Sequence, residues 1–172
     1  MKRTTLTLLL IVVATVLHAQ QPHQPPVEAQ VAFDRGVALR TAKDLQGALT
    51  ALSYAIQVDP NYSEAWRQRG LTYSDLGRAA EAMAEINQAI TIDPRNAKAY
   101  NSRAFLKYAQ KDYAGAVADT TLAIKMDPQF SNAHMNRGIT SYGLETPLAG
   151  WQMSNEPCKS IRAMRRQCIT SA

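Results

Sequence analysis

The stretch that decides the fold of this chain is WRQRGLTYSDLGRAAEAMAEINQAITIDP, residues 66–94. Its last four letters, TIDP, have counterparts in QVDP and KMDP, and the prolines of the three stretches, Pro60, Pro94 and Pro128, lie 34 residues apart. A fixed period of this length is typical of chains built from repeated supersecondary units. The sequence therefore predicts stacked units, each of which buries its apolar face against its neighbours.

Small residues recur with the same period. The columns are Ala48, Ala82 and Ala116; Ala55, Ala89 and Ala123; and Gly36, Gly70, Ala104 and Gly138. An arginine stands just before each member of the third column, at Arg35, Arg69, Arg103 and Arg137. Small side chains let two helices approach closely. We interpret the arginines as structural or partly solvated, with their aliphatic stems packed on neighbouring helices.

Apolar residues within each unit have helical spacing. Ala82, Ile86, Ala89 and Ile90 form one buried face, and the Asp-Pro pair ends the helix because the residue before proline disfavours helical angles. The sequence predicts first helices at about 29–42, 63–76 and 97–110, and second helices at about 44–57, 78–91 and 112–125. We expect turns at Leu76-Gly77 and Lys111-Asp112.

Trp66, Gly70, Tyr73, Ala82 and Pro94 together resemble the tetratricopeptide repeat, a helix–turn–helix unit of 34 residues. Arg69 stands where that family usually has leucine. The resemblance covers residues 29–142. It implies an all-α, right-handed superhelical array of antiparallel helix pairs over residues 29–144, with three full repeats and a partial fourth.

The resemblance also implies a concave groove, lined by the first helices, that binds a peptide or a partner protein. The candidate groove residues combine apolar, amide and charged side chains: Phe33, Val37, Glu64, Arg67, Gln68, Leu71, Lys98, Asn101, Phe105, Tyr108, Met135, Asn136 and Ile139. The aromatic residues among them also fit a core position. Some family members clamp a peptide's terminal carboxylate with basic and amide side chains. Here Lys98 keeps its place, whereas Ser102, Phe33 and Val37 replace other clamp residues.

The N-terminal residues resemble a secretory signal. Lys2 and Arg3 precede an apolar run over residues 6–17 that is short for a membrane-spanning helix. We expect a signal peptide over residues 1–19, cut after Ala19, and a proline-rich linker over residues 20–28. An uncleaved membrane anchor is the alternative. The first reading makes this an exported protein of the bacterial type, periplasmic or secreted.

The charge is concentrated at the two ends of the chain. The formal net charge is +5, of which the first three residues and residues 145–172 carry +2 each, which leaves +1 for residues 20–144. A nearly neutral body argues against nucleic acid as a partner. The alternative function is contact with a membrane surface or nucleic acid through the basic tail, KSIRAMRR.

Motifs for catalysis are missing from the sequence. It contains no glycine-rich phosphate loop, nucleophile elbow or metal-ligand spacing. Cys158 with His134 is the one conceivable nucleophile–base pair, and His134 stands in the column of Trp66 and Tyr100, where packing is expected. We therefore expect no enzyme, no cofactor and no metal.

The repeat pattern stops in the tail, residues 145–172. The period requires the next Asp-Pro at residues 161–162, where the chain has Ile161 and Arg162. Our hypothesis is that the tail is read in a shifted frame, whose codons can spell GDTARGLADVERALQIDPRDAPA from position 145 onward. The alternative is a divergent cap with an apolar stripe at Cys158, Ile161, Met164 and Cys168. Export would also permit a Cys158–Cys168 disulfide.

Overall fold

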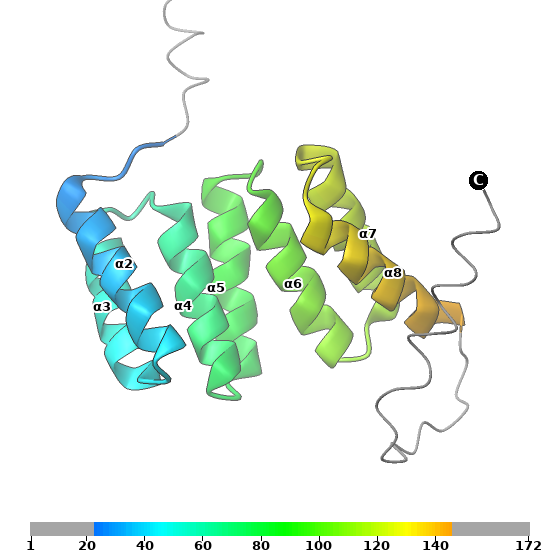
Figure 1. Cartoon of the computed structure of the whole chain (residues 1–172), viewed down its shortest axis with the longest axis horizontal. Helices are drawn as coiled ribbons and strands as arrows, with labels where there is room; N and C mark the ends of the chain where they lie inside the picture. The colour runs from blue at the N-terminus through cyan, green and yellow to red at the C-terminus, as the bar shows by residue number, and fades with distance from the viewer. Residues whose placement is uncertain (1–22, 146–172) are drawn as a thin grey trace, which may run out of the picture.

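The computed structural model describes residues 23–145, which form seven helices (Figure 1). The first helices of the units are α2 (Val27–Thr41), α4 (Ser63–Asp75), α6 (Ala97–Ala109) and α8 (Ser131–Glu145). The second helices are α3 (Leu45–Val58), α5 (Ala79–Ile92) and α7 (Tyr113–Met126). The described part of the chain holds no strand. This confirms the predicted fold of three helix pairs followed by a helix that begins a fourth.

The predicted helix boundaries agree with the observed ones to within two residues. The largest difference is at α2, which begins at Val27, inside the segment predicted as a linker. The carbonyl of Pro26 accepts a hydrogen bond from the Gln30 N–H (3.0 Å), so the helical ladder starts earlier than the apolar pattern indicated. Glu28 in the first turn also favours the helix start, because a negative charge interacts well with the N-terminal end of the helix dipole.

The Asp-Pro stretches form the loops between units. In each, the aspartate side chain accepts a hydrogen bond of 3.0 Å from the backbone N–H two residues later: Asp59 from Asn61, Asp93 from Arg95, and Asp127 from Gln129. This turn gives a backbone N–H of the loop a hydrogen-bond partner just after the helix has ended. The aspartate therefore has a structural reason to stand before each proline.

The turns inside each unit share a strained backbone position. Gly77 has a φ of 75°, and the equivalent residues Lys43 and Lys111 have φ values of 67° and 64°. This left-handed conformation is readily adopted by glycine but costs a residue with a Cβ about 1–2 kcal/mol. Only the middle unit carries glycine there, so two of the three turns hold lysine at a glycine-type position.

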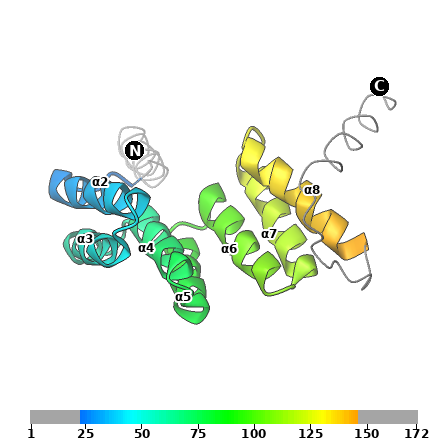
Figure 2. The ribbon, with the colours of Figure 1, turned by 60° about the horizontal axis from the view of Figure 1, so that its bottom comes forward.

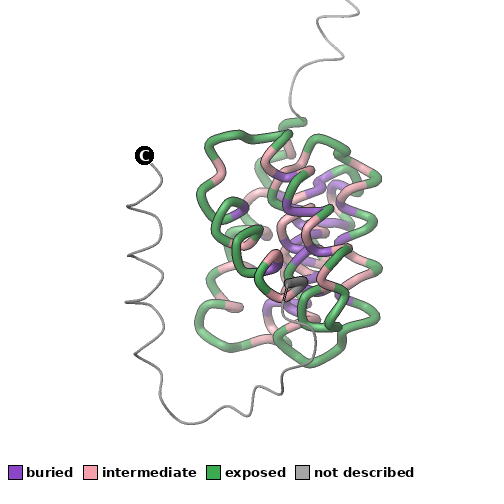
Figure 3. Tube along the Cα trace, turned by 90° about the vertical axis from the view of Figure 1, so that its right-hand side faces the viewer, coloured by how far each residue is buried: buried purple, intermediate pink, exposed green. Residues whose placement is uncertain are grey.

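The small-residue columns lie where the paired helices touch. A methyl group at Gly36 would lie 2.6 Å from Cγ of Leu52, and one at Gly70 would lie 2.8 Å from Cγ1 of Ile86. The two other columns, of alanine alone, are fully buried throughout, and Figure 3 shows that burial is concentrated between the helices. Much of this core is therefore made of closely packed helix backbones and small side chains rather than large side chains.

Two members of the arginine column, Arg69 and Arg103, link consecutive second helices, whereas Arg35 and Arg137 are exposed. Arg69 donates two hydrogen bonds of 2.9 Å to the Glu85 carboxylate and one of 3.1 Å to the Ser53 hydroxyl. Arg103 donates to Asp119 (2.8 and 2.7 Å) and to Asn87 Oδ1 (2.9 Å). Each arginine thus joins the second helix of its own unit to that of the unit before, which confirms the structural interpretation for these two.

We call Arg69 and Arg103, with their carboxylate partners, the arginine ladder. Its surroundings shift the pKa values of Arg103 and Glu85. The hydrogen bonds to Asp119 raise the pKa of Arg103. Burial raises the pKa of Glu85, and Arg69 opposes this effect only in part. The two guanidinium groups also lie over aromatic rings, Arg69 at 4.9 Å from the Trp66 ring centre and Arg103 at 5.4 Å from that of Tyr100. The ladder is therefore a packed feature and not a set of solvated side chains.

Candidate peptide-binding groove

The ribbon of helices curves toward its first helices. Among the described elements, α2 contacts α4, α4 contacts α6 and α6 contacts α8, whereas α3, α5 and α7 do not contact one another. The first helices are therefore closer together than the second helices, and they line the inner face of the stack (Figure 2). The two halves of this face differ in chemistry.

The N-terminal half of the inner face, between α2 and α4, is joined by polar side chains. Arg40 donates to Asp75 (2.7 Å) and to Gln68 Oε1 (3.3 Å). The Tyr62 hydroxyl, just before α4, donates to Gln30 (2.7 Å). Most groups that could receive a ligand here are already bonded to a neighbouring helix.

Tyr62 is buried in this half, and its ring packs against that of Phe33 with centroids 5.0 Å apart. Burial, followed by the negative charge of Asp34, raises the pKa of Tyr62 to about 12. Phe33 itself packs on the first core cluster. The predicted groove residue Phe33 therefore also serves the core.

Arg67 lies at the centre of the inner face and is 9% exposed. Its guanidinium group donates to both carboxylate oxygens of Glu64 and, at 3.2 Å, to the hydroxyl of Ser102 on α6. All three of its nitrogens are engaged, and because one of them binds Ser102, Arg67 joins α4 to α6. This arrangement gives it a structural role in addition to any contact with a partner.

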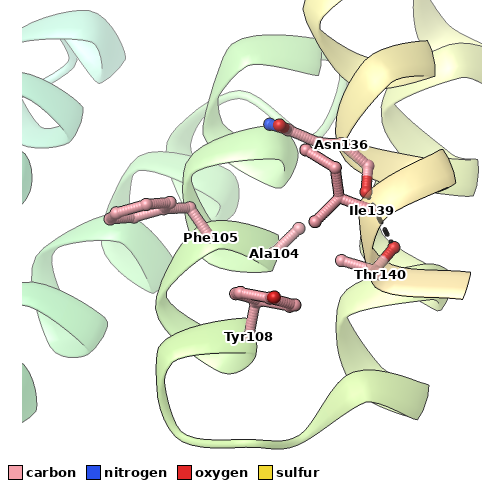
Figure 4. A pocket seen from close by; sticks show the side chains of 6 residues that line it. All are labelled: Ala104, Phe105, Tyr108, Asn136, Ile139 and Thr140. Carbon is pink, nitrogen blue, oxygen red and sulfur yellow. Dashed lines mark hydrogen bonds between the residues drawn. The ribbon is translucent and has the colours of Figure 1, made fainter. Parts of the chain in front are cut away.

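The C-terminal half of the inner face, between α6 and α8, exposes apolar side chains. Phe105 is 56% exposed, Met135 60% and Ile139 47%. A hollow of about 150 Å³ opens between the two helices and is lined by Ala104, Phe105, Tyr108, Asn136, Ile139 and Thr140 (Figure 4). Asn136 donates to Asn101 Oδ1 (2.9 Å) across the two helices. The hollow is thus apolar with an amide group at its edge, a composition suited to an apolar side chain of a ligand.

The structure brings four of the predicted groove residues together at this hollow: Phe105, Tyr108, Asn136 and Ile139. Leu71, by contrast, packs on the second core cluster, and Val37 is half-buried. Sequence reasoning missed Ala104 and Thr140 as lining residues, although Ala104 belongs to the small-residue column. It also missed the cross-helix pair Arg40 and Asp75, which lie 35 residues apart, close to one repeat length.

The basic groups of the inner face do not assemble into a carboxylate clamp. Arg40 and Arg67 are paired with carboxylates, and Lys98 is exposed at the edge of α6. Ser102, at a clamp position, accepts from Arg67 and donates to the carbonyl of Lys98 (2.9 Å). A terminal carboxylate would find one lysine in place of several convergent donors.

The remaining sequence expectations concern groups at the ends of the chain. His134 Nε2 lies 2.9 Å from the carbonyl oxygen of Pro128, as Trp66 Nε1 does from that of Pro60. Unlike Trp66 and Tyr100, however, His134 is exposed, so the packing expected at this column position is not found in the described part of the chain. Cys158 and the basic tail, like the signal segment, lie outside the described residues. Over residues 23–145 no helix is long and apolar enough to cross a membrane, and no cluster of metal-binding side chains occurs.

Comparison with known proteins agrees with this architecture. Residues 39–105 match the family model described as tetratricopeptide repeat. The chain is similar to the TPR2B domain of yeast Sti1 in its pHsp70 complex, at 25% identity over 70% of this chain and 98% of that one, with a TM-score of 0.64. No curated protein matches the sequence.

Two further solved structures share the fold. The first TPR of Spaghetti (RPAP3), bound to the HSP90 peptide SRMEEVD, is 20% identical over 73% of this chain and 100% of that one, with a TM-score of 0.65. The Sgt2 TPR domain from Aspergillus fumigatus is 18% identical over 83% of this chain and 99% of that one, with a TM-score of 0.67. The matched stretch is similar to tetratricopeptide repeats, and the described helices have the fold of TPR domains.

Proposed function

We propose that this chain is a protein-interaction module that holds an extended peptide or a partner segment against the inner face of α6 and α8. The observation that carries the proposal is the hollow between Phe105, Tyr108 and Ile139, with apolar side chains exposed around it. Exposed apolar side chains that gather around one hollow are typical of a ligand site, whereas scattered ones need no explanation. The peptides bound by the yeast Sti1 and RPAP3 domains support a partner of this general kind.

The chemistry of the inner face favours an apolar ligand over an acidic one. Arg40 and Arg67 are neutralised by Asp75 and Glu64, so little positive charge is free to receive the carboxylates of a peptide such as SRMEEVD. Phe105, Met135 and Ile139 instead offer apolar surface that a ligand would remove from water. Burying such surface contributes about 25 cal/mol per Å². We therefore expect one or two apolar anchors of the ligand to enter the hollow.

A peptide array tests this proposal. Extended peptides with a central leucine or phenylalanine are compared with the same peptides carrying alanine there, and with SRMEEVD. Binding of the best peptide is then measured by fluorescence anisotropy for the parent, for Phe105→Ala and for Ile139→Ala. Each substitution should weaken binding about tenfold, which corresponds to about 1.4 kcal/mol.

Val31→Ala is the matched control, because Val31 is an exposed apolar residue of a first helix (62% exposed) that does not line the hollow. It should bind like the parent. Equal binding by all variants, or a preference for SRMEEVD over the apolar peptides, would contradict the proposed ligand class. Unchanged helix content by circular dichroism separates lost binding from lost folding.

We also propose that the protein works outside the cytoplasm, which rests on the sequence of residues 1–19. Mass analysis of the mature protein should then show a chain that starts near Gln20. An intact Met1 on a membrane-bound product would favour the uncleaved anchor instead.

A further inference from the structure

The last described helix, α8, is covered on one side only. Within residues 23–145 it contacts α7 and α6 and no other helix. Its side toward α7 is buried: Ala133 is 0% exposed, Thr140 is 3% exposed, and Gly143 lies against the ring of Tyr113. Its other side carries His134, Arg137 and Gly138, all exposed. We call these three residues the open face of α8.

The equivalent residues of the earlier units are covered by a second helix. A methyl group at Gly70 would collide with Ile86 of α5, whereas one at Gly138 would meet no described atom within 4 Å. Trp66 and Tyr100 are half-buried, whereas His134 is exposed. The open face therefore has the small-residue column that lets a helix approach closely, without a helix on it in the described part of the chain.

Arg137 defines what such a helix must carry. Arg69 and Arg103 each bind a carboxylate 16 residues further along the chain, on the second helix of their own unit: Glu85 and Asp119. Arg137 makes no side-chain hydrogen bond or ion pair within residues 23–145. The residue 16 positions after it is Met153, which lies outside the described residues and has no carboxylate. By charge complementarity, a helix that covers the open face would carry an acidic or amide side chain at this register.

The shifted reading frame encodes such a side chain whichever synonymous codons the gene uses. Each codon of this frame consists of the third base of one in-frame codon and the first two bases of the next. The codon of Gln152 ends in A or G and that of Met153 begins with AT, so the junction encodes asparagine or aspartate and nothing else. This agreement is independent of the Asp-Pro pair that the same frame allows at residues 161–162.

We propose that the open face of α8 is the docking surface for the second helix of a fourth repeat, and that the DNA over residues 145–162 encodes this helix in the shifted frame. The helix pairs its aspartate with Arg137, as α5 and α7 pair a carboxylate with the arginine of their units, and it packs on Gly138. The proposal concerns the outer side of α8 and is independent of the ligand that we propose to bind between α6 and α8.

Adding the missing helix in trans tests the docking surface. The probe is the synthetic peptide GDTARGLADVERALQIDPRDAPA, and its matched control has alanine in place of the ninth residue, aspartate. The peptide should raise the melting temperature of the full chain in a concentration-dependent way, because it binds only the folded state. The alanine peptide should bind at least about fivefold more weakly, and Arg137→Ala should abolish that difference between the two peptides. Arg35→Ala, an exposed arginine of the same column, should leave it intact.

A covalent version avoids the entropic cost of ordering a free peptide. Restoring the shifted frame by one nucleotide should raise the melting temperature by about 5 °C or more, since the chain gains a stacking helix. Arg137→Ala should then lower the melting temperature of the restored chain and leave that of the present chain unchanged. An equal effect in both chains would overturn the proposal.

Two other results would overturn it as well. The gene sequence excludes the helix if the shifted frame reads TAA, a stop codon, at the Cys158–Lys159 junction. Deleting residues 146–172 from the present chain should leave the melting temperature unchanged. If the deletion lowers it, the in-frame tail itself stabilises the fold, and the open face belongs to a divergent cap.

Discussion

The two halves of the inner face occupy equivalent positions of the same repeat and differ in how their side chains are used. Between α2 and α4, Arg40 is held by Asp75 and Gln68, and these polar side chains join one helix to the next. Between α6 and α8, the aromatic and aliphatic side chains remain exposed around a hollow. The comparison shows that a shared backbone does not fix function. The side chains at the inner positions decide which part of the stack is a structural joint and which part can receive a ligand.

The largest expected effect compares Gly70 with Gly138. Gly70→Ala should lower the free energy of unfolding by about 1–3 kcal/mol, because the new methyl group lies 2.8 Å from Ile86 Cγ1 in a packed helix pair. Gly138→Ala should raise it by about 0.5–1 kcal/mol, since alanine favours helix and no described atom lies within 4 Å. Urea titrations followed by circular dichroism measure both. Equal losses of unfolding free energy in the two variants would mean that the open face of α8 is as tightly covered as the equivalent face of α4.

The next effect separates Arg67 from Phe105. Arg67→Ala should cost about 1–3 kcal/mol of stability, because it leaves Glu64 without its cation and removes the link to Ser102. Phe105→Ala should change stability by less than about 0.5 kcal/mol, because the ring is more than half exposed. The same urea titrations decide. A large loss for Phe105→Ala would move this residue from the ligand site to the core.

A third prediction concerns the turns, which the two halves share. Lys43→Gly and Lys111→Gly should each stabilise the fold by about 1 kcal/mol, because glycine adopts their positive φ without strain. Gly77→Ala should destabilise it through the backbone alone, since a methyl group there meets no described atom within 4 Å. Melting temperatures are the measurement. Gains at one lysine only would show that the halves differ in their turns as well as in their inner faces.

The smallest effect is a pH dependence that belongs to the N-terminal half. The pKa of Tyr62 in the folded protein is about 12, above its ordinary value of 10.0, so the folded state holds this proton more tightly. The contribution of Tyr62 to stability is therefore fully present below pH 10 and is lost as the pH rises toward 12. Tyr62→Phe should weaken the fall in stability over this range. Identical pH profiles for the two proteins would mean that Tyr62 ionises freely in the folded state.

The sequence by itself determined the repeat, the helices and the loops. The period of the Asp-Pro pairs placed the helix boundaries to within two residues, because these pairs act locally through a proline ring and an aspartate side chain. The inner positions of the first helices followed from the resemblance of these units to the tetratricopeptide repeat. Of the residues chosen there, Phe105, Tyr108, Asn136 and Ile139 line the hollow.

Only the tertiary structure decided which of those inner residues are free. Arg67 and Lys98 both lie at inner positions of first helices. Arg67 is hydrogen-bonded to Glu64 and Ser102, whereas Lys98 is exposed. Arg40 and Arg67 are bound by Asp75 and Ser102 on the first helix of the following unit, 35 residues further along the chain in each case. A local sequence pattern does not reveal pairs at this separation. The open face of α8 was also decided by the tertiary structure, because the sequence shows a glycine and an arginine there but not whether a helix packs on them. Burial and pairing depend on what is brought alongside from another unit, and that is a property of the packed stack.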